Sequence, residues 1–304
     1  MSNRMKRSSF LKLLMLSPFA NQVLANDNST LHAMKIKEME VLTGNFSLTE
    51  RMPVLFIGHG HPMNALFDNR FTQTLQGIGQ TIQRPNAIMV ISAHWQTQGT
   101  FVSVNPFPHT IYDFGGFDER LFQVKYEPKG HPVLAKEVIQ LLPFGKEDQK
   151  MGLDHGAWTV LKFLFPQADI PVFQLSIDYT QSVAKHYEIA QALKKMREKG
   201  VLLIGSGNIV HNLRKVDFYN IDGKTQDWAI EFDEQVKNKL DQQNFAALVD
   251  YKKMGQSALI AVPSEDHYLP MIYSLGLAYP NEPVTYLYEG FQFANISMRC
   301  FKIG

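Results

Sequence analysis

Cysteine is almost absent from this sequence, because Cys300 is the single one in 304 residues. One cysteine excludes an internal disulfide and any metal site built from several thiolates. A metal ion must therefore be held by histidine, aspartate or glutamate, which are ligands that suit iron, zinc or manganese. The chain contains ten histidines, so their positions carry the most information about function.

An excess of charge of either sign is also lacking, because 30 lysines and arginines stand against 29 aspartates and glutamates. No basic stripe stands out, so we expect no nucleic-acid partner. Hydrophobic residues make up 45% and charged residues 19% of the chain, as in an ordinary soluble globular protein. The length allows one large α/β domain or two small ones with a substantial core. The sequence does not predict an oligomeric state.

The apolar run at residues 10–16 is much shorter than the roughly 20 residues that span a bilayer, so we expect no stable membrane insertion. Basic residues precede this run, and the tripeptide VLA at 23–25 follows it with small residues at the positions that a signal peptidase reads, in the order of a secretory signal. These basic residues are Arg4, Lys6 and Arg7. A frayed amphipathic tail is the alternative interpretation of the same segment.

The segment 6–12 resembles a twin-arginine export signal, with Ser8 where the second arginine would stand. We therefore predict an export signal over residues 1–25 and a lead-in with little core pattern over residues 26–50. A single folded domain is expected over residues 51–304. If the signal is used, the protein is periplasmic or exported; otherwise it is cytoplasmic.

From residue 52 onward, short apolar runs alternate with amphipathic stretches. Apolar runs without polar alternation are typical of strands buried on both faces; they occupy residues 54–57, 87–91, 171–177 and 201–204. Two stretches, 183–193 and 225–240, repeat apolar residues at three- and four-residue steps, which predicts helices. Gly200 stands where the first of these helices would have its C-cap.

Strands that alternate with helices predict a mainly parallel sheet covered by helices. Residues 101–104 and 284–303 are expected to add further strands, which makes the sheet a mixed one. The chain has no internal repeat, no low-complexity tract and no Pro/Gly linker. The fold prediction is α/β, as a single domain with a central mixed, mostly parallel sheet flanked by helices.

Three histidines follow three of the predicted strands. His59 comes directly after the first strand, His94 ends the second, and His211 lies just beyond the strand at 201–204. Ligands of open α/β sheets collect at the carboxyl ends of parallel strands, so we expect these three side chains to converge. A single histidine at a strand end is more often a hydrogen-bonded structural residue than a ligand. That interpretation weakens when three occupy equivalent positions.

The other histidines fall into three groups. His155 begins one amphipathic helix, and His267 precedes another. Two more, His61 and His109, lie in loops that can border a pocket. A structural role is expected for the remaining three, which lie in the N-terminal tail or on helices with polar neighbours: His32, His131 and His186.

Competing motifs do not fit. The pairs Gly58/Gly60 and Gly205/Gly207 lack the third glycine of a dinucleotide fingerprint. A phosphate loop, an HExxH motif and a GxSxG nucleophile elbow are also missing from the sequence. The sequence DFGGFD at residues 113–118 is either a paired-carboxylate site or a glycine-rich loop whose aromatic residues line a pocket or the core.

At these residues the sequence resembles the class III extradiol dioxygenases of the LigB superfamily, in particular the 4,5-DOPA dioxygenase extradiol group. The resemblance runs from about residue 52 to residue 304, and its motifs occur in the family's order. They are GHGHPM at 58–63, SAHW at 92–95, YDFGGF at 112–117, DHG at 154–156, SGN at 206–208, HNL at 211–213 and HYLP at 267–270. The family has serine where His61 stands, and the stretch 110–113 also departs from its pattern.

The resemblance implies that residues 51–304 are a catalytic domain with a metal ion bound by four histidines. These are His59, His94, His211 and His267. It implies further that His155 flanks the substrate, that ring cleavage requires Fe(II), and that Zn(II) can occupy the site in the isolated protein. The expected reactants are a small catecholic substrate and O₂.

In such a reaction the catechol hydroxyls become more acidic on a metal ion, and a base must accept a proton. We expect His155 or His211 to move protons, with His211 also able to complete the ligand set of a resting Zn(II) form. Glu265 or Asp266 is the alternative source of a carboxylate ligand. Two rival functions use the same histidines: a zinc hydrolase, and a non-catalytic protein that binds a metal or ligand.

Overall fold

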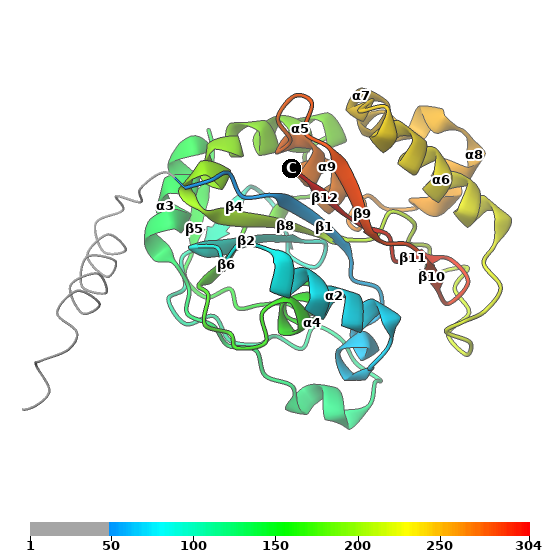
Figure 1. Ribbon diagram of the computed structural model, residues 1–304, viewed down its shortest axis with the longest axis horizontal. Helices are drawn as coiled ribbons and strands as arrows, with labels where there is room; N and C mark the ends of the chain where they lie inside the picture. Colours follow the sequence, from blue (N-terminus) through cyan, green and yellow to red (C-terminus); the bar gives the residue numbers. More distant parts are fainter. Residues whose placement is uncertain (1–48) are drawn as a thin grey trace, which may run out of the picture. The chain divides into compact units, whose positions relative to one another are not determined.

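The computed structural model describes residues 49–304. The predicted export signal, and all but the last two residues of the predicted lead-in, lie outside the described residues. A six-stranded sheet forms the centre of the described part (Figure 1). Its strands, in spatial order, are β6 (Val172–Gln174), β2 (Ala87–Ser92), β8 (Val201–Gly207), β1 (Val54–Gly58), β12 (Cys300–Ile303) and β9 (Val284–Tyr288).

The first four strands of that order run parallel to one another. The last two are added in antiparallel steps, β12 against β1 and β9 against β12. The predicted mixed, mostly parallel sheet in a single α/β domain is therefore confirmed. Strand register aligns the carboxyl ends of three central strands, because Gly58 of β1 pairs with Gly207 and Ser92 of β2 pairs with Ser206.

Helices cover the two faces of the sheet (Figure 1). On one face lie α2 (Arg70–Thr81) and α4 (His155–Leu164), and on the other lie α5 (Val183–Ala192) and α9 (Leu269–Gly276). Side chains alternate along β8, so Leu202 and Ile204 join the core cluster that contains Trp158 of α4. A Cβ atom on Gly205 would instead meet the carbonyl oxygen of Pro270 in α9 at 2.3 Å. Both faces of the sheet are therefore closely packed.

The remaining elements surround this core. The helices are α3 (Pro132–Leu141), α6 (Asp227–Asp241), α7 (Phe245–Val249) and α8 (Gln256–Ala261), with short 3-10 helices η2 (Pro62–Leu66), η3 (Glu119–Gln123), η4 (Lys194–Lys199) and η5 (Tyr251–Met254). The short strands are β3 (Gln96–Thr97), β4 (Phe101–Ser103), β5 (Lys146–Asp148), β7 (Ile177–Asp178), β10 (Phe291–Gln292) and β11 (Ile296–Ser297). No helix within residues 49–304 is long and apolar enough to cross a membrane.

Three local predictions differ from the structure. The apolar run 171–177 is not one strand, because β6 pairs with β2 whereas β7 pairs with β3 in a separate two-stranded sheet. The predicted strand at 101–104 exists as β4, but it pairs with β5 outside the central sheet. Gly200, with φ of 75°, ends the 3-10 helix η4, since α5 already stops at Ala192. Apolar periodicity identifies a buried strand but not its partner.

Candidate active site

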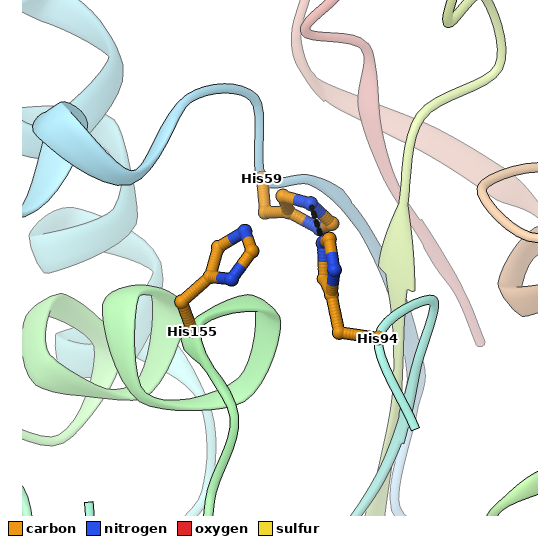
Figure 2. A group of neighbouring side chains, drawn as sticks. All are labelled: His59, His94 and His155. Carbon is orange, nitrogen blue, oxygen red and sulfur yellow. Dashed lines mark hydrogen bonds between the residues drawn. The ribbon is translucent and has the colours of Figure 1, made fainter. Parts of the chain in front are cut away.

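Three histidines meet beyond the carboxyl ends of the central strands. His59 directly follows β1, His94 lies two residues beyond β2, and His155 is the first residue of α4. The ring centroids of His94 and His155 are 3.8 Å apart, and that of His59 lies 5.1 Å from His94. Figure 2 shows the three rings close together, each carried by a different element.

Two further histidines extend this group. His267, just before α9, has its ring centroid 5.3 Å from that of His59 and 4.9 Å from that of His94. His211, in the segment after β8, stacks face to face on His267 at 3.5 Å and an interplanar angle of 7°. The structure thus brings together the five histidines His59, His94, His155, His211 and His267 from five separate parts of the chain.

The other described histidines lie elsewhere. His109 is exposed, His131 accepts a backbone N–H bond at the start of α3, and His186 forms a 2.9 Å hydrogen bond with a buried tyrosine hydroxyl. His61 is linked to the five-histidine group through the rings of Phe117 and Phe114. His32 lies outside the described residues.

Glycine allows the segment that carries His267 to lie against β8. A Cβ atom on Gly207 would stand 2.2 Å from the carbonyl oxygen of His267, closer than real Cβ contacts. The next residue, Asn208, donates its backbone N–H to the same carbonyl at 2.9 Å. The close approach of these two backbones therefore fixes His267 relative to the end of β8.

A serine determines which nitrogen of His59 carries the proton. The hydroxyl of Ser206 lies 2.5 Å from the carbonyl oxygen of Gly156, to which it must donate. With its single hydrogen used, it accepts from Nδ1–H of His59 at 3.0 Å. Nε2 of His59 therefore holds a free lone pair, and it lies 3.1 Å from Nε2 of His94 (Figure 2).

Carboxylates orient two of the other imidazoles. Oδ2 of Asp113 lies 2.9 Å from Nδ1 of His155, and Oδ1 accepts the backbone N–H of His155. Burial acts to raise the pKa of Asp113, but its hydrogen bonds with His155 outweigh burial and the pKa lies below its usual value. Asp118 instead binds Arg120. The two aspartates of the DFGGFD segment thus have different partners.

Asp266 holds His267 in the same way, with Oδ2 2.5 Å from Nδ1 of the imidazole. The carboxylate of the neighbouring Glu265 instead pairs with Lys252 at 2.6 Å and accepts from the hydroxyl of Tyr251 at 3.3 Å. Of the two carboxylates considered from sequence, only Asp266 contacts this histidine group, and it does so as the partner of an imidazole.

Burial and neighbouring imidazoles lower the pKa values of four of these histidines, His59, His94, His211 and His267, and so favour their neutral forms. Burial, followed by the neighbouring His155, lowers the pKa of His94 to about 3, and burial lowers the pKa of His211 to about 4. The pKa values of His59 and His267 also fall well below the ordinary value, because both rings are buried and face other imidazoles. Neutral imidazoles at pH 7 are the form that binds metal ions.

Within the described residues, two neighbouring sets of side chains have ligand atoms close enough to share a metal ion. One consists of His59, His94 and His155, and the other of His211, Asp266 and His267; the ligand atoms within each set lie within 4.8 Å of one another. Nitrogen–metal bonds of about 2.0–2.1 Å place two ligands of one ion roughly 3 Å apart. The 3.1 Å between Nε2 of His59 and Nε2 of His94 fits that requirement.

Two buried residues, Ser92 and Asp154, support the site although no sequence pattern of their own marks them as functional. The hydroxyl of Ser92 donates to Oδ1 of Asp154 at 2.5 Å and accepts the backbone N–H of His94 at 3.2 Å. Asp154 also caps α4, directly before His155. Each supporting residue stands one or two positions from a site histidine, so adjacency within a motif was the available signal.

Aromatic side chains form a wall that leads away from the histidines, called here the aromatic wall. Phe114 packs edge to face on His155 at 5.6 Å, and Phe117 lies 5.5 Å from Phe114. His61 contacts Phe117 at 4.7 Å, and burial, with a smaller effect of His155, lowers its pKa to about 4. The wall continues through Phe293 to Phe218, whose side chain is 53% exposed.

Comparison with known proteins identifies this architecture. The family described as the catalytic LigB subunit of aromatic ring-opening dioxygenase matches residues 52–297. The 4,5-DOPA dioxygenase extradiol of Escherichia coli K12 is 42% identical over 260 residues, which is 84% of this chain and 95% of that protein. The enzyme of the same name from Beta vulgaris is 35% identical over 255 residues, 81% of this chain and 94% of that protein.

A solved structure agrees with these matches. The crystal structure of an uncharacterized protein from Escherichia coli K12 is similar with a TM-score of 0.73 and 39% sequence identity, covering 84% of this chain and all of that one. The chain belongs to the LigB family and is a non-heme, metal-dependent extradiol dioxygenase that opens aromatic rings. Family membership favours this class over the zinc hydrolase and the non-catalytic binding protein.

Proposed function

We propose that this enzyme cleaves a catecholic, DOPA-like ring with O₂ at an Fe(II) ion held by His59, His94 and His267. The observation that carries the proposal is the 3.1 Å approach of the unprotonated Nε2 of His59 to Nε2 of His94, two rings whose pKa values are lowered mainly by burial. The names of the Escherichia coli and Beta vulgaris relatives point to DOPA as the first substrate to test.

The partners of the outer nitrogens support this ligand set. Nδ1 of His59 is held by Ser206 and Nδ1 of His267 by Asp266, which leaves Nε2 of each ring as its available ligand atom. His211 stacks on His267 and is assigned as the further ligand that completes the set when Zn(II) is bound. When bound, Fe(II) would supply a Lewis acid and a path for electrons between the aromatic substrate and O₂.

We assign His155 as the residue that moves protons. Its Nδ1–H is directed at Asp113, which leaves Nε2 as the acceptor for a catechol hydroxyl proton. The Asp113 carboxylate then stabilises the imidazolium that forms, in the manner of a base oriented by a third group. Phe114 packs edge to face against the ring of His155, which adds an apolar contact beside the proposed base.

Oxygen uptake tests the proposal. Protein reconstituted with Fe(II) is given DOPA and a panel of other catechols, and the coloured ring-opened product is followed by absorbance. We expect uptake by the Fe(II) protein, none by the Zn(II) protein, and none by a His94→Ala variant. Bound Fe(II) without uptake on any catechol would contradict the proposal and favour one of the two rival functions.

We also propose that residues 1–25 direct export and that the catalytic domain spans residues 51–304. The family match over residues 52–297 supports the domain limits, and the basic, apolar and small-residue order of the N-terminus supports export. Fractionation of cells and the mass of the mature chain test this proposal. A full-length chain found only in the cytoplasm would contradict the export signal.

A further inference from the structure

His61 lies in the aromatic wall rather than among the five site histidines. It follows Gly60, whose φ of 65° turns the chain away from His59. Its ring meets Phe117 at 4.7 Å, Phe293 at 5.0 Å and Phe218 at 6.4 Å. These phenylalanines belong to three segments distant in sequence, so His61 is a polar residue placed between apolar surfaces.

The hydrogen bonding of His61 fixes its tautomer. Nδ1 accepts the backbone N–H of Met63 at 3.3 Å, which caps the 3-10 helix η2. An accepting Nδ1 has no proton, so the proton of the ring is on Nε2. Within residues 49–304, no group accepts a hydrogen bond from this Nε2–H, and the ring is only partly buried. The aromatic wall therefore presents one unused donor.

The order of the ring contacts places the His61 ring relative to the reacting centre. Phe114 contacts His155, Phe117 contacts Phe114, and His61 contacts Phe117. A substrate ring beside His155 would lie against the start of the aromatic wall. A substituent that extends from this ring toward the exposed Phe218 would pass His61.

We infer that His61 is a positioning and specificity residue that donates Nε2–H to a carboxylate on the substrate side chain, remote from the two hydroxyls. The inference rests on the proposed function and narrows its substrate class to catechols with a short acidic side chain. A hydrogen bond to a charged acceptor is stronger than one to a neutral group. A side chain that carries a cation without a carboxylate would face the positive end of the N–H dipole and is not favoured.

Ligand binding to the Zn(II)-loaded protein tests the inference without turnover. Calorimetry compares dihydroxyphenylacetate, which carries the carboxylate, with methylcatechol, which does not. A His61→Phe variant has an aromatic ring at this position but no N–H donor, so we expect the affinity ratio of the two ligands to shift about tenfold or more toward methylcatechol. His61→Asn keeps a donor and an acceptor for the backbone N–H of Met63. Its affinity ratio should therefore lie between those of the wild type and His61→Phe.

His109→Phe is the matched control, because His109 is an exposed loop histidine that stands outside the five-histidine group and the aromatic wall. It should leave the ratio unchanged. With the Fe(II)-loaded enzyme, His61→Phe should change the ratio of the KM values for the two catechols and leave the ratio of their kcat values unchanged. An unchanged ratio, an equal loss for both ligands, or no binding of either ligand to the wild-type protein would overturn the inference. If both ligands bind but the Fe(II) protein consumes no O₂, the proposed function fails while the ratio still decides the role of His61.

Discussion

The hydroxyl of Ser206 accepts a hydrogen bond from Nδ1 of His59 at 3.0 Å, because it donates its own hydrogen to the carbonyl of Gly156 at 2.5 Å. Because Nδ1 of His59 is the donor in this hydrogen bond, Nε2 of His59 carries no proton, and its lone pair faces Nε2 of His94. Ser206 is the residue of β8 that pairs in register with Ser92 of β2. One side chain on the central sheet thus sets the tautomer of a proposed ligand.

A Ser206→Ala variant tests this relationship. It removes the acceptor for Nδ1–H, so we expect the affinity for Zn(II) to fall about 10- to 100-fold, as for other lost partners of metal-bound histidines. Competition against a chelating dye measures the affinity. The control is Ser274→Ala, which removes another buried hydroxyl, one that donates to the carbonyl of Pro270. Equal affinities for wild type and Ser206→Ala would show that the serine does not orient the ligand.

A His155→Ala variant tests whether His155 moves protons or binds the metal ion. If His155 moves protons, the variant keeps one metal ion per chain but loses about a hundred- to ten-thousandfold in kcat. His267→Ala, in contrast, should lose the metal ion. Metal content by mass spectrometry, measured beside oxygen uptake, gives both quantities. Loss of metal from His155→Ala with retention in His267→Ala would reverse our assignment.

The Gly207→Ala variant tests the close contact between β8 and the segment that carries His267. The added Cβ would meet the carbonyl oxygen of His267 at 2.2 Å, so that segment must move. We expect a loss of about 1–3 kcal/mol of stability and weaker metal binding, both measured by thermal unfolding with and without Zn(II). Gly77→Ala in α2, where a Cβ would meet no atom within 4 Å, should instead gain up to about 1 kcal/mol. Equal effects of the two changes would contradict the packing argument.

The metal-free protein should lose stability as the pH falls below about 6.5. Burial lowers the pKa of His186 to about 4, and burial and neighbouring imidazoles lower the pKa of His94 to about 3. Between these values and the ordinary one, the unfolded chain binds protons that the folded chain does not. Each such group therefore lowers the free energy of unfolding by up to about 1.4 kcal/mol per pH unit of acidification.

Urea unfolding of the metal-free protein across this pH range measures the effect. The glutamine of a His186→Gln variant cannot titrate, and its amide oxygen can still accept a hydrogen bond from the hydroxyl of Tyr273. The free energy of unfolding of this variant should therefore depend less steeply on pH than that of the wild type. Stability that stays constant or rises on acidification would contradict the predicted direction.

The central fold was predictable because its strands are buried on both faces. The apolar runs at 54–57, 87–91 and 201–204 correspond to β1, β2 and β8. Their parallel arrangement was predicted from the alternation of strands with helices. The pairing of the 171–177 run was not predictable, since β7 leaves the central sheet to pair with β3. The strand with which an apolar segment pairs depends on contacts between residues that are distant in sequence.

The site was predictable in part for the same reason. His59 and His94 follow buried parallel strands, and the strand-end rule alone points to their proximity. The contact between Asp113 and His155 joins residues 42 positions apart, so no local sequence pattern predicts it. The hydrogen-bond direction at Ser206 depends on the carbonyl of Gly156 in another element. Partners of this kind are fixed by tertiary packing rather than by sequence periodicity.

The most direct test of the account uses isotopically labelled O₂. The Fe(II)-loaded enzyme is incubated with a catechol that supports oxygen uptake, and the product is analysed by mass spectrometry before its carbonyl oxygen can exchange with water. The account predicts a ring opened beside, not between, the two hydroxyls, with both labelled oxygen atoms in one product molecule, and no such product from His94→Ala. A product without label, or one that has gained only the elements of water, would contradict it.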